Sequence, residues 1–374
     1  MGKYELTISK NYVPDWGVVE AVRELFQNAL DQETISKNNS MFFSYDEENE
    51  VLEIGNKESV LEASSLLLGN TTKLNDEVTI GQFGEGYKIA MLILLRNNIN
   101  IKVANYGKKE IWKPRFVNSR RYGQEILTVF TEKMIWSKPP DNSLIISLDG
   151  VTSEMYEKIV ESNLHLQGDI SCKISKKYGR VLTDKNYKGN IYVNGLFITT
   201  NSELDYGYDF LPSVLKLRRD RSMVDDFDLR NTTTSLWENL IGEETPAIVK
   251  MITDNSRDIS LMQYSFSAGK KVSTDVYDKF REQHGENSIA ISNNTEIHTF
   301  MEEHPDSKPI VVQDNMYKII SNDPRNSEEI DRLTVEIDRT AIEKLELWYK
   351  KLTEGTYVSS TLKEEFHEIL KELS

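Results

Sequence analysis

The chain has 374 residues, an ordinary hydrophobic share of 39% and a formal net charge of −15, which argues against broad, sequence-independent coating of nucleic acid. Its one cysteine, Cys172, excludes internal disulfides and fits a reducing cytoplasm. No apolar run reaches the roughly 18 residues that span a bilayer, and the start of the chain lacks a signal-peptide core, so we expect a cytoplasmic protein with no membrane partner.

The first helix is expected directly after Pro14 and Asp15, with Asp15 capping its free backbone N–H groups. At about 100° per residue, apolar and polar side chains separate onto opposite faces. The apolar face holds Val18, Val22, Leu25, Phe26, Ala29 and Leu30, and the polar face holds Glu20, Glu24, Gln27, Asn28 and Asp31. Glu24 and Asn28, four residues apart, point the same way. The simple alternative is an acidic face that is only solvated.

A glycine-rich segment, Gly81–Lys88, precedes an apolar run from Ile89 to Leu95 that is expected to be a buried helix. Glycine lets backbone N–H groups approach oxyanions closely, and the positive end of a helix favours negative charge. The segment could therefore cradle phosphate. Its spacing fits neither the Walker loop nor the dinucleotide fingerprint, and a glycine-rich turn without function is the alternative.

Three further segments are expected to form β-structure, because their apolar residues alternate or flank residues that favour a turn. We expect strands at Val51–Ile54 and Asn142–Leu148. The segment Gly189–Ile198, with Asn194 and Gly195 between two apolar runs, predicts a hairpin with a type I′ turn.

The C-terminal part is expected to begin with a helical stretch from Ser235 to Ile259 and to continue as a small α/β module. Parallel strands and flanking helices are expected at Ala290–Ile291, Pro309–Val312, Val276–Gln283 and Thr295–Glu303. Two charged amphipathic helices lie around Gly355. Their apolar stripe either packs on this module or docks a partner or a second subunit.

The helix and the glycine-rich segment together read E-x-x-x-N-x-x-D and G-x-x-G-x-G-x-K. This combination resembles the GHKL superfamily, the ATPases of gyrase, heat-shock chaperone, histidine-kinase and mismatch-repair proteins. The resemblance covers residues 4–150 and, more loosely, residues 180–235, and implies an α+β protein. Residues 1–150 would form a GHKL-type α/β sandwich with a mixed sheet covered by helices, and residues 151–260 a transducer-like α+β domain. The strand and helix pattern described above adds a third domain, residues 261–374, as an α/β module with a helical tail.

The resemblance also implies roles for individual residues. Glu24 matches the general base that orients the attacking water, Asn28 matches the amide that holds Mg²⁺, and Asp31 matches a residue that supports the nucleotide pocket. The glycine-rich segment would contact ATP through Gly81, Gln82, Phe83, Gly84, Glu85, Gly86, Tyr87 and Lys88.

At the positions expected to contact the adenine base, this chain matches the GHKL superfamily less closely. The family has an Asp that accepts from the adenine amino group where this chain has Asn56, so we expect a weaker adenine contact. Thr72 and Lys73 resemble the lid that approaches phosphates, with an ordinary exposed loop as the alternative. Ser143 takes the place of a Thr beside adenine, or is a turn residue.

In the companion domain, Arg219 or Arg221 would reach the γ-phosphate and stabilise charge there. An ion-paired helix start, with Asp220, Asp225 and Asp226 neutralising these arginines, is the alternative.

These expectations combine into a Mg²⁺-dependent, ATP-hydrolysing switch that changes how the protein meets a partner or a second copy of itself. The alternative is a nucleotide-binding or degenerate-site interaction scaffold with little turnover. Residues 3–13 could form a strap exchanged between subunits, or an edge strand within one subunit.

Overall fold

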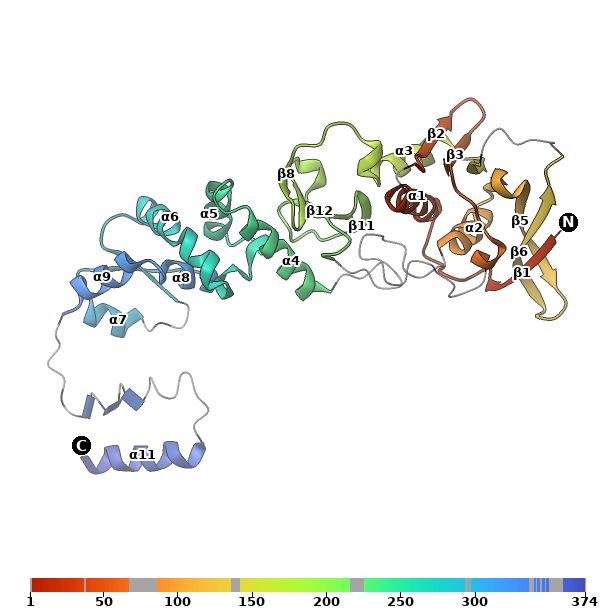
Figure 1. Cartoon of the computed structure of the whole chain (residues 1–374). Coiled ribbons are helices and arrows are strands. Elements are labelled where there is room, and N and C mark those ends of the chain that lie inside the picture. Colours follow the sequence, from red (N-terminus) through yellow and green to blue (C-terminus); the bar gives the residue numbers. More distant parts are fainter. Residues whose placement is uncertain are drawn as a thin grey trace. The chain divides into compact units, whose positions relative to one another are not determined.

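The computed structural model describes residues 2–36, 38–66, 86–135, 142–215, 225–292, 295 and 297–335, with residue 340 and parts of 342–349 and 359–373. The chain divides into two compact units, residues 1–251 with 256–262 and residues 252–255 with 263–374 (Figure 1). The predicted boundary after residue 150 lies inside the first unit, whereas the one after residue 260 lies close to its end. Within the described residues, none of the helices has both the length and the apolar character needed to cross a membrane.

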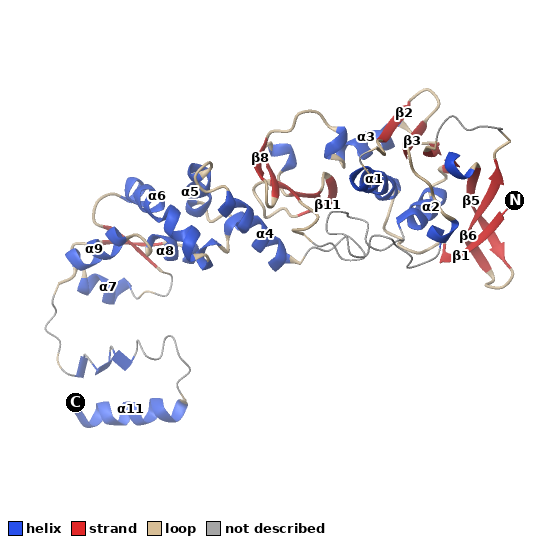
Figure 2. Ribbon diagram, viewed as in Figure 1, coloured by secondary structure: helices blue, strands red, loops and turns tan. Residues whose placement is uncertain are grey.

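The first unit begins with a seven-stranded sheet of order β1-β6-β5-β4-β7-β3-β2. Figure 2 labels β1, β2, β3, β5 and β6 of this sheet. Its strands are β1 (Gly2–Ser9), β2 (Met41–Asp46), β3 (Val51–Asn56), β4 (Asn100–Asn105), β5 (Glu110–Ser119), β6 (Gln124–Lys133) and β7 (Leu144–Asp149). Each neighbouring pair is antiparallel, so the predicted mixed sheet is wrong. The reason is β7: it inserts between β3 and β4, which run in the same direction and would otherwise pair in parallel. At the edge, β1 pairs with β6 of the same chain.

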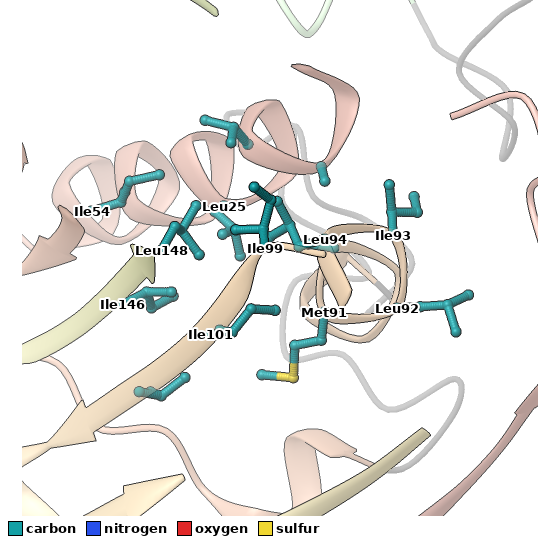
Figure 3. Close-up of a cluster of buried hydrophobic side chains, with 14 of the residues drawn as sticks. Leu25, Ile54, Met91, Leu92, Ile93, Leu94, Ile99, Ile101, Ile146 and Leu148 are labelled. Carbon is teal, nitrogen blue, oxygen red and sulfur yellow. The ribbon is translucent and has the colours of Figure 1, made fainter. Parts of the chain in front are cut away.

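Three helices accompany this sheet: α1 (Val18–Ile35), α2 (Gly86–Arg96) and α3 (Ser153–Glu161). Leu25 of α1 and Met91 and Leu94 of α2 meet strand residues such as Ile54 and Ile146 in one buried cluster (Figure 3). The expected cap of α1 is wrong. Gly17, not Asp15, is the N-cap residue, and its N–H donates 2.8 Å to the carboxylate of Glu20, so a side chain of the first turn supplies the acceptor.

A second sheet in the same unit has the order β11-β10-β12-β9-β8. Its strands are β8 (Cys172–Ser175), β9 (Gly179–Leu182), β10 (Asn190–Val193), β11 (Leu196–Thr200) and β12 (Gly207–Phe210). The predicted hairpin is confirmed as β10 and β11, and both turn residues, Asn194 and Gly195, have positive φ. The helical stretch expected from Ser235 to Ile259 is two helices, α4 (Asp226–Asn239) and α5 (Thr245–Thr253), because the chain turns at Gly242 with φ of +103°.

Asp258 is fully buried, and its hydrogen bonds connect the C-terminal end of the first unit to the second sheet of that unit. Its carboxylate accepts from the backbone N–H groups of Asp205 (2.8 Å) and Tyr206 (3.2 Å) and from the hydroxyl of Tyr208. Burial raises the pKa of Asp258, while these donors favour its ionised form. The network holds residues 256–262 in the first unit although the four residues before them belong to the second.

The second unit confirms the small α/β module. Strands β13 (Ser288–Ile291) and β14 (Lys308–Val311) pair in parallel, as expected. Its helices are α6 (Phe266–His284), α7 (Ile297–Glu303), α8 (Asp314–Ile320), α9 (Pro324–Leu333) and α11 (Ser360–Leu373). The two helices expected beside these strands correspond to α6 and α7.

Candidate functional site

The polar face of α1 is turned into the protein. Glu24, Gln27 and Asp31 are each only 2% exposed, and Asn28 is half-buried. The alternative of a solvated acidic face is therefore wrong for these side chains. Burying a carboxylate is costly unless it is compensated, and the guanidinium of Arg23 lies 3.9 Å from the carboxylate of Glu24.

The N-terminus of α2 lies directly against this polar face. A Cβ added at Gly86, the first residue of α2, would sit 2.9 Å from Oε2 of Glu24 and 3.1 Å from Nδ2 of Asn28. Both distances are shorter than usual for a Cβ, so a larger residue at position 86 would require the ends of the Glu24 and Asn28 side chains to move. A carboxylate and an amide thus meet the backbone of α2 at Gly86.

Two further residues of the first turn of α2 face the protein interior. Lys88 is fully buried, and its Nζ donates 3.1 Å to the carbonyl of Ser65 in the 3₁₀ turn Ala63–Leu66. Burial raises the pKa of Tyr87, and the nearby carboxylate of Asp31 raises it further. Tyr87 is accordingly a neutral phenol at physiological pH.

Asn56 is buried at the end of β3, and its amide serves the fold. Its Nδ2 donates to the carbonyl of Ala29 in α1 (2.9 Å) and to that of Asn39 (3.3 Å). An ionised aspartate at this position would have no hydrogen to donate to these two carbonyls, so the amide is required by the local packing. Ser143, also buried, precedes β7, and its carbonyl accepts from the N–H of Tyr106 (3.0 Å).

The structure therefore brings Glu24, Asn28 and Gly86 together, with Asp31 beside Tyr87. The remaining predicted site residues lie outside the described part of the chain: Thr72, Lys73, Gly81, Gln82, Phe83, Gly84, Glu85, Arg219 and Arg221.

Arg23, to which the sequence pattern assigns no role, links α1 to the second sheet. Its Nη1 donates 3.0 Å to the carbonyl of Phe197 in β11, and its guanidinium lies over the ring of Trp16. One turn further along α1, Phe26 stacks on His165. No pattern within the helix could have identified a partner 174 positions away in the chain.

The described residues contain no group of three or more His, Cys, Asp or Glu side chains placed to hold a metal ion. This does not conflict with a magnesium site, because Mg²⁺ commonly takes one or two protein oxygens and completes its shell with water and substrate phosphates. The amide of Asn28, next to the glycine that opens α2, is a donor of that kind.

No protein-family model matches the chain. An uncharacterized protein of Mycoplasma pneumoniae is 24% identical over 245 residues, which are 63% of this chain and 97% of that protein. Among solved structures, the ATPase region of topoisomerase II from Saccharomyces cerevisiae bound to dexrazoxane has a TM-score of 0.34 at 9% identity, over 52% of this chain and 72% of that one. The ATPase and transducer domains of Balamuthia mandrillaris topoisomerase II have a TM-score of 0.31 at 10% identity, over 48% and 60%.

Proposed function

We propose that the protein binds ATP with Mg²⁺ and hydrolyses it at the junction of α1 and α2. The observation that carries the proposal is the position of Gly86: its missing side chain lets the first turn of α2 approach Glu24 and Asn28. The glycine leaves space beside Glu24 and Asn28 that a Cβ would fill, and glycine lets the backbone approach a ligand closely.

Each residue has a role that its chemistry permits. The carboxylate of Glu24 would align a water molecule and accept its proton, and the amide oxygen of Asn28 would bind the metal. Mg²⁺ bound to ATP neutralises charge on the phosphates. Residues 81–85, Thr72, Lys73 and either Arg219 or Arg221 complete the proposed phosphate site.

The link from α1 to the second sheet supports a switch. Arg23, adjacent to Glu24, is bonded to β11, and Phe26 contacts His165. A movement of Glu24 on nucleotide binding would therefore alter the position of Arg23, which bonds to the second sheet. The resulting change in the second sheet would alter binding of a protein partner or a second subunit.

Isothermal titration of the full chain with a non-hydrolysable ATP analogue, with and without Mg²⁺, tests the site. We expect magnesium-dependent binding that Asn28→Ala abolishes and that Asn97→Ala, an exposed control just after α2, leaves intact. Absence of heat at millimolar analogue with the wild-type protein would refute the proposal.

A second candidate, a nucleotide-binding scaffold with little turnover, is favoured by one observation. Asn56 and Lys88, two predicted contacts of the nucleotide, donate to backbone carbonyls of the protein itself. Tight binding of ATP without phosphate release would select this candidate over the switch.

A further inference from the structure

The face of the first sheet opposite to the helices carries a separate hollow of about 210 Å³ between β4, β5 and β6. Side chains of a strand alternate between faces, and Ile101 and Val103 belong to the helix-covered core. Lys102 and Ala104 therefore face the other way. Ala104 is paired with Ile111 and Ile111 with Glu132, so these three side chains form one row across the three strands.

The hollow is mainly apolar in its walls. Ala104, Ile111, Met134 and Ile135 line it, and Ile135 is 98% exposed at its mouth. Its size corresponds to one large side chain rather than to a nucleotide or a drug-sized ligand, whose pockets are typically about 300–1,000 Å³. An apolar hollow with an exposed isoleucine at its rim is the arrangement of a pocket that receives an anchor side chain.

The charge around the hollow is positive although the chain as a whole is strongly acidic. Lys102 and Lys133 line it, and neither has an acidic partner among the residues that the structure describes. The one lining carboxylate, Glu132, is already occupied, because it accepts from Nζ of Lys113 at 2.7 Å. Among the described residues neither lysine makes an ion pair within 4 Å, although Glu110 lies across the strand pair from Lys133.

We propose that this hollow is a docking site for an acidic peptide segment of a partner protein. One large apolar side chain of the segment enters between Ile111 and Ile135, and carboxylates beside it pair with Lys102 and Lys133. Complementary charge steers the encounter and the apolar anchor supplies the main burial energy. The site lies across the sheet from α1 and α2, so the proposal does not depend on ATP binding.

The test uses the full-length protein with methyl-labelled isoleucine and methionine, and three synthetic heptapeptides followed by NMR. The first has a leucine flanked by three glutamates on each side, the second has alanine in place of the leucine, and the third has lysines in place of the glutamates. We expect the first to shift the methyl signals of Ile111, Met134 and Ile135, and the other two to bind at least about tenfold more weakly.

In the double variant Lys102→Glu with Lys133→Glu, the affinity for the acidic leucine peptide should fall at least about tenfold. The matched control, Lys176→Glu with Lys185→Glu, makes the same charge change at exposed positions of the second sheet's loops and should bind as wild type. Unchanged methyl spectra away from the hollow check that the variants fold.

Equal binding of the leucine and alanine peptides, or shifts outside the hollow, would overturn the proposal. So would self-association at rising protein concentration that the double variant abolishes, since the occupant would then be a second copy.

Discussion

At the scale of single residues, the site depends on polar groups buried where α1 meets α2. Glu24 is almost completely covered, yet it lies beside a guanidinium and beside the first residue of α2. Asn56 is equally buried, but its role is to hold the fold: its amide donates to the carbonyls of Ala29 and Asn39, which an ionised carboxylate could not do. Similar burial thus accompanies a proposed reactive role in one case and a positional role in the other.

Replacing Glu24 with Gln separates these roles. The variant keeps the size of the side chain but cannot accept a proton from water, so we expect ATP turnover to fall by at least about 100-fold while binding of ATP persists. Phosphate release and calorimetric titration measure the two quantities. Glu157→Gln, an exposed change on α3, is the control. Turnover equal in Glu24→Gln and wild type would remove Glu24 from the chemistry.

At the scale of elements, the glycine at position 86 of α2 is explained by packing rather than by helix propensity. Gly86 is a poor helix former, and alanine there would gain up to about 1 kcal/mol of intrinsic propensity. A Cβ there would, however, lie 2.9 Å from Oε2 of Glu24 and 3.1 Å from Nδ2 of Asn28, so the ends of these side chains would have to shift. The element therefore gives up local stability for close approach.

Gly86→Ala should weaken nucleotide binding by at least about tenfold while changing the unfolding midpoint little, because propensity and crowding oppose each other. Titration with the ATP analogue and urea unfolding check both halves. Gly168→Ala, where a Cβ meets nothing within 4 Å, is the matched control. Undiminished affinity in Gly86→Ala would show that the space beside Gly86 is not used.

The start of α9 in the second unit is held by charge. Asp323, the N-cap residue, accepts from the N–H of Arg325 at 2.9 Å and from its guanidinium. These donors, led by the Arg325 side chain, lower the pKa of Asp323 below its ordinary value of 3.8. A lowered pKa in the folded state means that the stabilisation is complete above the unfolded value and is lost as the pH falls through the folded one.

Asp323→Asn should therefore destabilise the second unit by about 1 kcal/mol at pH 7, a modest value because Arg325 is solvent-exposed. The difference from wild type should shrink as the pH falls from about 5 towards 3. Urea unfolding followed by circular dichroism at several pH values measures it. A difference that stays constant across that range would contradict the assigned charge pairing.

At the scale of the whole molecule, each unit has a hydrophobic core of its own. The larger cluster joins the seven-stranded sheet to α1 and α2, and a smaller one in the second unit includes Ile289, Ile291 and Leu333. Every described residue of the proposed ATP site belongs to the first unit. We therefore expect the folding of the first unit and the proposed nucleotide binding to be independent of the second unit.

A fragment of residues 1–262 should fold cooperatively and bind the ATP analogue with the affinity of the full chain. Calorimetric melting should lose one transition relative to the full chain and retain the transition that nucleotide shifts upward. A fragment that is unfolded by circular dichroism would show that the first unit needs the second.

Local sequence patterns were sufficient to predict those elements that depend only on the conformational preferences of neighbouring residues. The hairpin at Asn194 and Gly195 follows from two residues that tolerate positive φ. The pairing of β13 with β14 follows from two short apolar runs separated by the helix α7. The spacing of Glu24 and Asn28 likewise places both side chains on one face of α1, because residues four apart in a helix are neighbours.

Only the tertiary structure decided what that face meets. Helical periodicity cannot distinguish a solvated polar face from one buried against another helix, and it cannot assign a bond from Arg23 to β11. The antiparallel sheet depends on β7, which follows β3 and β4 in the chain and lies between them in the sheet. Contacts of this kind join residues far apart in sequence, so they are set by packing of the whole unit and leave no signal in any local segment.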